Sequence, residues 1–238
     1  MCVQWIERSK LSAATSRSLQ PADIVLDIGC GIRPQQMVIP NVHICCDPHG
    51  QYLEHLHHTS KLKEDRLYIF VQATWAEAVK LFLPQSVDTV FLLDVIEHVE
   101  KAEGKQLLHL TEPIARRQVV VFTPLGFVPQ EHPDGKDAWG LNGGEWQRHR
   151  SGWSFEDFED GWEIFASKDF HLTDNTGNQL AAPYGAFWAI KTLNRLKSNS
   201  ARRKVHRFFD RAINRAADIL VSTNALGTGI GKHIRKLR

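Results

Sequence analysis

Residues 24–31 constrain the fold of this chain more than any other segment, because they read Ile-Val-Leu-Asp-Ile-Gly-Cys-Gly. A short, nearly continuous apolar run that ends in two glycines is typical of a buried parallel strand that leads into a tight turn. Glycine suits such a turn because it adopts positive φ without strain and lets a ligand approach the backbone closely. The segment therefore predicts a nucleoside-type ligand at the carboxyl end of this strand.

A second short strand, residues 43–47, ends in Asp47, twenty positions after Asp27. In doubly wound sheets an acid at this spacing accepts hydrogen bonds from ribose hydroxyls. The dinucleotide-binding pattern would require Gly or Ala at position 34, but this chain has Pro34. The departure argues against a helix packed tightly under a pyrophosphate, and therefore against NAD or FAD.

Two motifs together resemble those of the class I S-adenosylmethionine-dependent methyltransferases. The first is Leu26-Asp-Ile-Gly-Cys-Gly31 with Asp47 downstream, and the second is Asp94-Val-Ile-Glu-His-Val99. The second motif is similar to the subgroup of ubiquinone-biosynthesis and other small-molecule methyltransferases. The resemblance covers roughly residues 20–195 and implies that the cofactor is S-adenosylmethionine, which has no pyrophosphate.

The resemblance also implies roles for residues at the first two strand ends. Asp27 would meet the methionine amino group of the cofactor, and Asp47 would meet its ribose. Gly29 and Gly31 would form the turn on which the cofactor lies.

Three further residues are implied as cofactor contacts. Gln72 and Ala73 end the expected third strand and would frame the adenine, with an amide in place of the usual acid. Asp94 ends the expected fourth strand and would lie on the methionine side.

The fold implied by the resemblance is a doubly wound α/β fold of the Rossmann-like methyltransferase type. Its sheet would have seven mostly parallel strands, with one antiparallel strand in a terminal hairpin. Further strands are expected at residues 67–73, 86–94, 118–124 and 186–191. Helices are expected over residues 51–63, 74–83 and 97–115, and residues 1–20 should form a cap or helix before the first strand.

Composition limits the class of protein. A chain of 238 residues suits one α/β domain with a full core. The first twenty residues lack the apolar stretch of a signal peptide, and no segment is apolar for long enough to span a bilayer. The four cysteines form no zinc-binding spacing, which favours reduced thiols in a cytoplasmic protein.

The charge is distributed unevenly along the chain. Residues 197–238 hold eleven Lys and Arg against two Asp, a net charge of +9; since the whole chain is +2, the remainder is −7. The sequence therefore predicts a methyltransferase domain at 1–195 and a basic amphipathic C-terminal helix and tail at 196–238. Packing on the core and contact with an anionic membrane at the inner face are the two leading roles for the tail.

Residues 125–153 are rich in glycine and proline and predict a long loop. Polar groups and three tryptophans suit a substrate lid, because indole faces stack on sugar rings or bases. The alternative is a structural loop whose tryptophans fill the edge of the core. His149 and His132 on this loop are the candidate general bases, and Glu145 and Arg148 are expected to orient His149.

Asp94, Glu97 and His98 would share one face of a helix beginning at position 94. Three interpretations remain open: contacts near the cofactor, a charge pair at a helix start, or a metal site. Asp-x-x-Glu-His with His149 downstream is similar to the metal-binding small-RNA 2′-O-methyltransferases, although the first ligand would be Asp. We expect no metal, because metal-free relatives carry the same run and no RNA-binding domain is evident.

The resulting hypothesis is methyl transfer from S-adenosylmethionine to a hydroxyl of a small or sugar-containing, lipid-linked or free, acceptor. Nucleic acid is not an expected partner. One rival is a metal-dependent RNA ribose 2′-O-methyltransferase, and the other is a non-catalytic S-adenosylmethionine-binding module. Fold alone does not decide among these functions.

Overall fold

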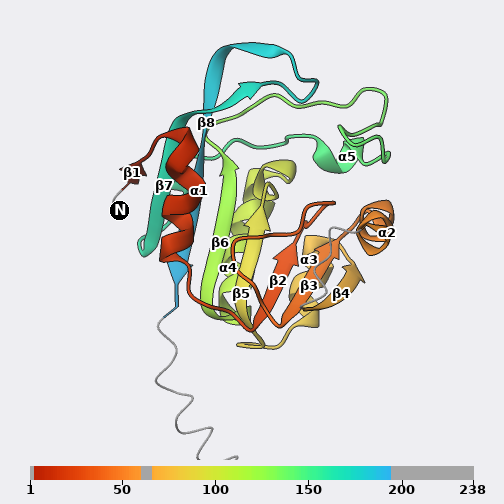
Figure 1. Cartoon of the computed structure of the whole chain (residues 1–238), viewed down its shortest axis with the longest axis vertical. Helices are drawn as coiled ribbons and strands as arrows, with labels where there is room; N and C mark the ends of the chain where they lie inside the picture. Colours follow the sequence, from red (N-terminus) through yellow and green to blue (C-terminus); the bar gives the residue numbers. More distant parts are fainter. Residues whose placement is uncertain (1–2, 60–65, 194–238) are drawn as a thin grey trace, which may run out of the picture. The chain divides into compact units, whose positions relative to one another are not determined.

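The computed structural model describes residues 3–59 and 66–193, shown in Figure 1. The expected basic tail at 196–238 lies outside the described residues, as does the end of the helix expected over 51–63. None of the described helices is long and apolar enough to cross a membrane.

The described residues form one eight-stranded sheet with the order β1-β7-β8-β6-β5-β2-β3-β4. Within these residues β8 is antiparallel to both of its neighbours, and the other strand pairs are parallel. The strands are β1 (Val3–Trp5), β2 (Ile24–Ile28), β3 (Val42–Asp47), β4 (Leu67–Gln72), β5 (Val87–Leu93), β6 (Ala115–Pro124), β7 (Trp162–Thr173) and β8 (Gln179–Thr192).

The expected doubly wound α/β fold is therefore confirmed, with one correction to the strand count. Seven strands were expected, and the additional one is the short β1, which pairs in parallel with β7 at the sheet edge. Its three residues, Val3–Trp5, carry no alternation long enough to predict a strand. Pairing with β7 stabilises it.

The order of the strands reverses beside β2. The chain passes from β2 to β3 and β4 on one side, and then returns to β5 on the other side. Since ligands of doubly wound sheets bind at the carboxyl ends of strands where the order reverses, this topology places the site beside β2 and β5. Gly29 and Asp94, the residues that follow these strands, are thereby brought to the same edge.

Helices flank the sheet at positions close to those expected, but one begins later. The helices are α1 (Arg8–Ser18), α2 (Gly50–His58), α3 (Trp75–Leu81), α4 (Lys101–Ile114) and α5 (Gly144–Gln147), with 3₁₀ turns at Ile96–His98 and Phe155–Asp157. The helix expected over 97–115 begins at Lys101, because Val99 and Glu100 are extended. Thr74 forms a capping box with Glu77 at the start of α3.

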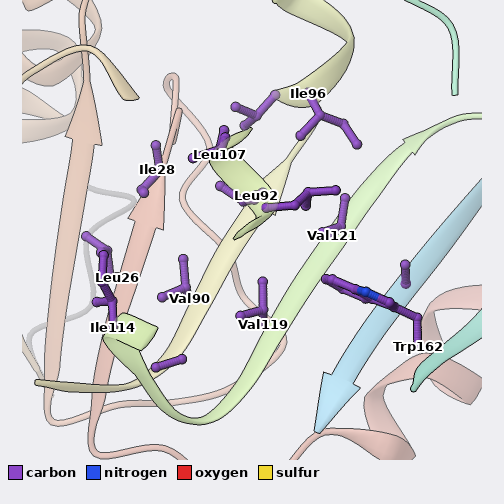
Figure 2. Close-up of a cluster of buried hydrophobic side chains, with 14 of the residues drawn as sticks. Leu26, Ile28, Val90, Leu92, Ile96, Leu107, Ile114, Val119, Val121 and Trp162 are labelled. Atoms are coloured by element: carbon purple, nitrogen blue, oxygen red, sulfur yellow. The ribbon is translucent and has the colours of Figure 1, made fainter. Parts of the chain in front are cut away.

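Alternating residues of the central strands supply two cores, one on each face of the sheet. Figure 2 shows Leu26, Val90 and Val119 from neighbouring strands packed beside Leu107 and Ile114 of α4. The intervening residues point to the other face, where Leu11 of α1 belongs to a second apolar cluster with Val25, Phe91 and Val120. The period of two explains why strands buried on both faces appear as continuous apolar runs.

Candidate functional site

The turn after β2 has the positive φ values that its glycines predict. Gly29 has φ +71°, and a Cβ on it would lie 2.7 Å from Cγ2 of Val95. Its N–H donates to the carbonyl of Cys46 at 2.8 Å. Gly31 has φ +52° and donates its N–H to Oδ2 of Asp47 at 2.9 Å. The two glycines thus connect the ends of β2 and β3.

Asp47 is held by backbone amides on both carboxylate oxygens. Oδ2 accepts from Gly31 N, and Oδ1 accepts from His49 N at 2.9 Å. Burial raises the pKa of Asp47, while these two backbone hydrogen bonds oppose the rise. Each oxygen keeps a second lone pair, so the carboxylate is oriented and still able to accept hydrogen bonds from a ligand.

A pocket opens beside this carboxylate, and we call it the strand-end pocket. Its walls come from the ends of β2, β3 and β5, from the start of α3 and from the region of α5. The lining residues are Ile28, Gly29, Asp47, Pro48, Tyr52, Thr74, Trp75, Asp94, Val95, His98, Val99, Glu103, Glu145, Trp146, Gln147 and Arg150. Gly29, Asp47 and Asp94 are therefore the predicted cofactor residues that border it.

Asp27 lies behind the wall rather than in it. Its side chain is 2% exposed; Oδ2 accepts from the Gln35 N–H at 2.7 Å and contacts Nε2 of His43 at 3.2 Å. Burial alone would lower the pKa of His43, but hydrogen bonding to Asp27 and Cys45 outweighs it and raises the pKa to about 9. Asp27 therefore anchors β3 and the turn after β2, and its predicted contact with a methionine amino group stays a prediction.

Gln72 and Ala73 also lie beside the strand-end pocket without lining it. The amide nitrogen of Gln72 donates to Pro48 O at 3.3 Å, and Ala73 N donates to Asp47 O at 3.1 Å. The next two residues, Thr74 and Trp75, form the wall at this position. The wall thus lies two residues further along the chain than expected, and the framing of an adenine by Gln72 and Ala73 stays a prediction.

The long loop at 125–153 is fixed to α2 by Asp137. The Tyr52 hydroxyl donates to Oδ2 of Asp137 at 2.5 Å, and backbone amides of Trp139, Leu141 and Gly143 donate to the same carboxylate. These bonds hold α5 next to the strand-end pocket, and Figure 1 shows α5 on the side of α2. The loop thus borders the pocket, as a substrate lid would.

Trp153 at the end of this loop belongs to the core instead. Its side chain is fully buried, and Nε1 donates to Ile96 O at 3.0 Å. Its ring also lies against Gly104 of α4, where any Cβ would collide with it. For this tryptophan the structural interpretation holds, whereas Trp146 lines the strand-end pocket and is 45% exposed.

A second pocket lies toward the β7–β8 hairpin, and we call it the hairpin-side pocket. Its lining residues are Asp94, His98, Pro124, Val128, Pro129, Gln130, Gln147, His149, His171, Thr173, Asp174, Asn175, Leu180 and Tyr184. Asp94, His98 and Gln147 line both pockets. The two pockets are therefore neighbours that share one wall.

Asp94 occupies this shared wall in an unusual backbone conformation. Its φ is +52°, and its N–H donates to Phe122 O at 2.9 Å. A non-glycine residue with positive φ is strained, and such strain concentrates at functional sites. Asp94 is exposed in the cleft, but the walls of the cleft keep water away from its carboxyl. This desolvation raises the pKa of Asp94 to about 6, although the contact with Glu97 opposes the rise. No helix begins at Asp94, so the predicted helix face is wrong, but the 3₁₀ turn at Ile96–His98 still groups the three residues.

His98 and His149 form a ring pair beside Asp94, with centroids 4.9 Å apart. Nδ1 of His98 contacts Arg148 O at 3.2 Å, and Nδ1 of His149 contacts Val128 O at 2.6 Å. A carbonyl only accepts, so each Nδ1 carries a proton, and each Nε2 of the neutral ring carries a lone pair. Burial and the neighbouring His149 lower the pKa of His98 to about 3.

The expected orientation of His149 by Glu145 and Arg148 is wrong. Glu145 pairs with Arg150, and Arg148 pairs with Glu131 at 3.8 Å. The Val128 carbonyl fixes His149 instead, a contact that no local spacing would reveal. His149 lines the hairpin-side pocket, whereas His132 is not among the described residues that line either pocket. His132 is nevertheless near enough for its charge to help lower the pKa values of His98 and His149.

Sequence reasoning missed several residues that line the site. Thr74, Trp75, His171 and Tyr184 carry no motif, and only the three-dimensional packing reveals their place. Tyr52 was likewise unsuspected, although it lines the strand-end pocket and bonds to Asp137.

Comparison with protein-family models and with curated protein sequences finds no match. Among solved structures, TehB from Haemophilus influenzae is 14% identical over 76% of this chain and 61% of its own, with a TM-score of 0.52. A SAM dependent methyltransferase from Archaeoglobus fulgidus is 16% identical, over 79% of this chain and 95% of its own, with a TM-score of 0.49. Magnesium protoporphyrin IX methyltransferase from Synechocystis PCC 6803, solved with bound SAM, is 14% identical over 77% and 76%, with a TM-score of 0.46. At these identities, what the chain shares with TehB is its fold, a doubly wound α/β sheet.

Proposed function

We propose that this protein transfers a methyl group from S-adenosylmethionine to a hydroxyl group of a small or sugar-containing acceptor. One observation carries the proposal: the strand-end pocket, which contains the oriented Asp47 carboxylate, shares Asp94 and His98 with a second pocket. A group-transfer enzyme with two substrates needs two neighbouring sites of this kind.

The residues of the strand-end pocket fit S-adenosylmethionine. Asp47 offers two oriented acceptors for ribose hydroxyls, and Gly29 leaves its backbone open where a side chain would collide with Val95. Trp75 offers an aromatic face at the place where the adenine is expected. Asp94 supplies a carboxylate near the methionine end. Pro34, in place of a third glycine, gives no support to a pyrophosphate.

When bound, S-adenosylmethionine supplies an activated methyl group, so the protein needs little chemical machinery of its own. The main contribution of this chain is alignment of the acceptor with the methyl group, which alone supplies a large share of the acceleration. The two pockets meet at the wall formed by Asp94 and His98. The loop at 125–153, which the Tyr52–Asp137 hydrogen bond holds in place, borders both pockets.

The hairpin-side pocket is suited to a polar acceptor. It has a volume of about 420 Å³, within the usual range for small-ligand sites. Gln130, Asn175 and Tyr184 offer hydrogen-bonding groups for hydroxyls, and the Nε2 lone pair of His149 is available to take a proton from one of them. The neutral state of His149 is favoured because burial lowers its pKa.

The test is a transfer assay with labelled cofactor. The full chain is incubated with S-adenosylmethionine labelled on the methyl group, together with fractionated extract that separates polar metabolites, glycans, lipid-linked saccharides and RNA. We expect label in a hydroxylated small-molecule or glycan fraction, and no transfer with Asp47→Ala.

Label in the RNA fraction would support the rival ribose methyltransferase. Cofactor binding without label in any fraction would support a non-catalytic binding module. Asp23→Ala is the matched control, because Asp23 precedes β2 at the opposite end of the strand.

A further inference from the structure

We propose that Glu97, His98 and His149 form a binding site for a divalent transition-metal ion in the wall between the two pockets. From the sequence alone no metal is expected here, since the Asp-Val-Ile-Glu-His run also suits a metal-free site. The three-dimensional arrangement supports the opposite conclusion for four reasons.

The first reason is convergence of the donors. One ligand atom from each of Glu97, His98 and His149 lies within 4.8 Å of the other two. The residues come from two separate segments, the 3₁₀ turn after β5 and the loop that precedes Trp153. Since ligands about 2.1 Å from a tetrahedral ion lie about 3.4 Å apart, the donor atoms would need to approach one another by at most about 1.4 Å to close this set around an ion.

The second reason is the direction of the imidazole lone pairs. Both Nδ1 atoms face backbone carbonyls, Arg148 O for His98 and Val128 O for His149. Metal-binding histidines commonly donate the proton of one ring nitrogen to a carbonyl or carboxylate, which fixes the other nitrogen as the ligand. In His98 and His149 the same arrangement leaves both Nε2 lone pairs available to bind a metal ion.

The third reason is an unsatisfied carboxylate oxygen. The Glu97 side chain is 2% exposed; Oε2 accepts from the Thr123 hydroxyl at 3.1 Å, whereas no N–H or hydroxyl group of the described residues donates to Oε1. The neighbouring side chain is the carboxyl of Asp94, so the two acids must share a proton or a cation. A buried, unpaired carboxylate oxygen costs free energy unless it is protonated or meets a cation. A divalent ion satisfies it without a proton.

The fourth reason is a support that holds the two segments together. The Glu97 carbonyl accepts from Arg150 N at 2.8 Å and Ser151 N at 3.1 Å. Ser151 Oγ donates to Val99 O at 2.8 Å, and Trp153 Nε1 donates to Ile96 O. These bonds hold the 3₁₀ turn that carries Glu97 and His98 against the loop segment that carries His149. A metal site needs its ligands held in place in this way.

The donor set also selects the kind of ion. Two imidazoles with one carboxylate suit Mn²⁺, Fe²⁺, Co²⁺ or Zn²⁺, whereas Mg²⁺ and Ca²⁺ prefer oxygen ligands throughout. Three protein ligands leave coordination positions open, and His98 and His149 both border the hairpin-side pocket. If the proposed function holds, on which this consequence rests, a bound ion would make an acceptor hydroxyl at an open position more acidic. The hydroxyl proton would then pass to water as the O–CH3 bond forms and the S–CH3 bond breaks, which leaves S-adenosylhomocysteine. In this arrangement His149 is a ligand rather than a free base.

Metal binding is tested on the full chain after treatment with a chelator, without any methyl acceptor. Titration with Mn²⁺ is followed by the loss of the electron paramagnetic resonance signal of free Mn²⁺, and Zn²⁺ binding is followed by calorimetry. We expect one equivalent of either ion to bind. Glu97→Gln, His98→Asn and His149→Asn should each weaken binding by more than about tenfold, the scale already seen when supporting residues are lost.

His171→Asn is the matched control, because His171 lines the hairpin-side pocket outside the cluster and should leave metal binding unchanged. Where a variant fails to fold, NMR of the wild-type protein labelled with ¹⁵N in histidine replaces it. Zn²⁺ should then shift the Nε2 resonances of two of the twelve histidines.

The metal site is contradicted if the folded wild-type protein binds no ion, if all three folded variants bind as the wild type does, or if no histidine resonance shifts. Titration of the same samples with S-adenosylmethionine separates this failure from failure of the proposed function. Cofactor binding without metal binding removes only the metal site, and metal binding without cofactor binding removes only the proposed function.

Discussion

The strand-end pocket and the hairpin-side pocket share a wall, but the chain constructs them in different ways. The strand-end pocket depends on short segments that follow β2, β3 and β5, where the turn residues and the functional residues are neighbours in sequence. The hairpin-side pocket combines the end of β6, two parts of the long loop and the β7–β8 hairpin. Most of the first pocket is thus built from turns at strand ends, with one wall added by the long loop, whereas the second is built mainly from the loop and the hairpin.

The two pockets also differ in how much change in sequence their geometry tolerates. Gly29 and Asp47 allow little variation. A Cβ on Gly29 would collide with Val95, and a shorter side chain at position 47 would lose the hydrogen bond from Gly31 N. Residues 128–130 and 171–184 lie on a loop and a hairpin that can change length without disturbing the central sheet. Under the proposed function, the choice of acceptor would rest on the part of the molecule that the sequence predicts least well.

The largest effect is expected at Trp153, where the long loop joins the core. Trp153→Ala should lower the free energy of unfolding by about 3–5 kcal/mol, because it empties a fully buried site. The half-exposed Trp146 is the control, and Trp146→Ala should change stability by less than about 0.5 kcal/mol. Urea denaturation measures both. Equal, small losses would show that Trp153 is not a core residue.

The second prediction concerns the buried Asp27–His43 pair beneath the strand-end pocket. His43 also neighbours Cys45 and stacks on Tyr68, and its pKa rises from 6.5 to about 9. A raised pKa stabilises the fold fully below pH 6.5, and that contribution is lost as pH rises through about 9. Unfolding free energy should therefore fall by up to about 3 kcal/mol between these values.

Urea denaturation across that pH range tests this prediction, with His43→Gln flattening the profile. His57→Gln, which removes an exposed histidine of α2, is the control and should keep the wild-type profile. A profile that rises with pH in the wild type, or one that His43→Gln leaves unaltered, would show that the pair does not stabilise the fold.

The third prediction separates the two pockets directly. His149→Ala should lower turnover by about 10²-fold or more, because either proton removal or metal binding at this side chain acts in the transition state. The affinity for S-adenosylmethionine should change little, because His149 lines only the hairpin-side pocket. Steady-state kinetics and calorimetry measure the two quantities. The control is His109→Ala, which changes an exposed residue of α4. Full activity in His149→Ala would show that His149 has no chemical role and that alignment of the substrates accounts for the rate.

The fourth prediction tests the strand-end pocket alone. Asp47→Ala should weaken binding of S-adenosylmethionine by about 1.5–3 kcal/mol, because charge-assisted hydrogen bonds to the ribose are lost. Calorimetric titration of the folded variant measures the change. Asp23→Ala should bind as the wild type does. An unchanged dissociation constant in Asp47→Ala would place the ribose elsewhere.

Much of the strand-end pocket could be predicted from the sequence, because its residues follow strands whose apolar pattern is strong. Gly29, Asp47 and Asp94, which this logic selects, do line the pocket, and their contacts with a cofactor stay predictions. The role of Asp27 was not foreseen, since its partner His43 is reached only through the pairing of β2 with β3. The hydrogen bond from His149 to the Val128 carbonyl depends on how the loop folds back on itself, and no periodicity records that.

The count of strands and the start of α4 show the same limit. The three-residue β1 is stabilised by β7, more than 150 positions away in the chain, so no local signal predicts it. The delayed start of α4 at Lys101 comes from extended residues at Val99 and Glu100, where Ser151 and the loop pack on the preceding turn. Tertiary contacts overrode the helical spacing that the sequence displays.

Calorimetric titration of the full chain with S-adenosylmethionine, S-adenosylhomocysteine and NAD tests the central claim most directly. The account predicts one binding site for each of the two adenosyl compounds and no binding of NAD, because Gly29 and Asp47 fit the nucleoside while Pro34 replaces the glycine that a pyrophosphate requires. Binding of NAD without binding of S-adenosylmethionine would contradict it.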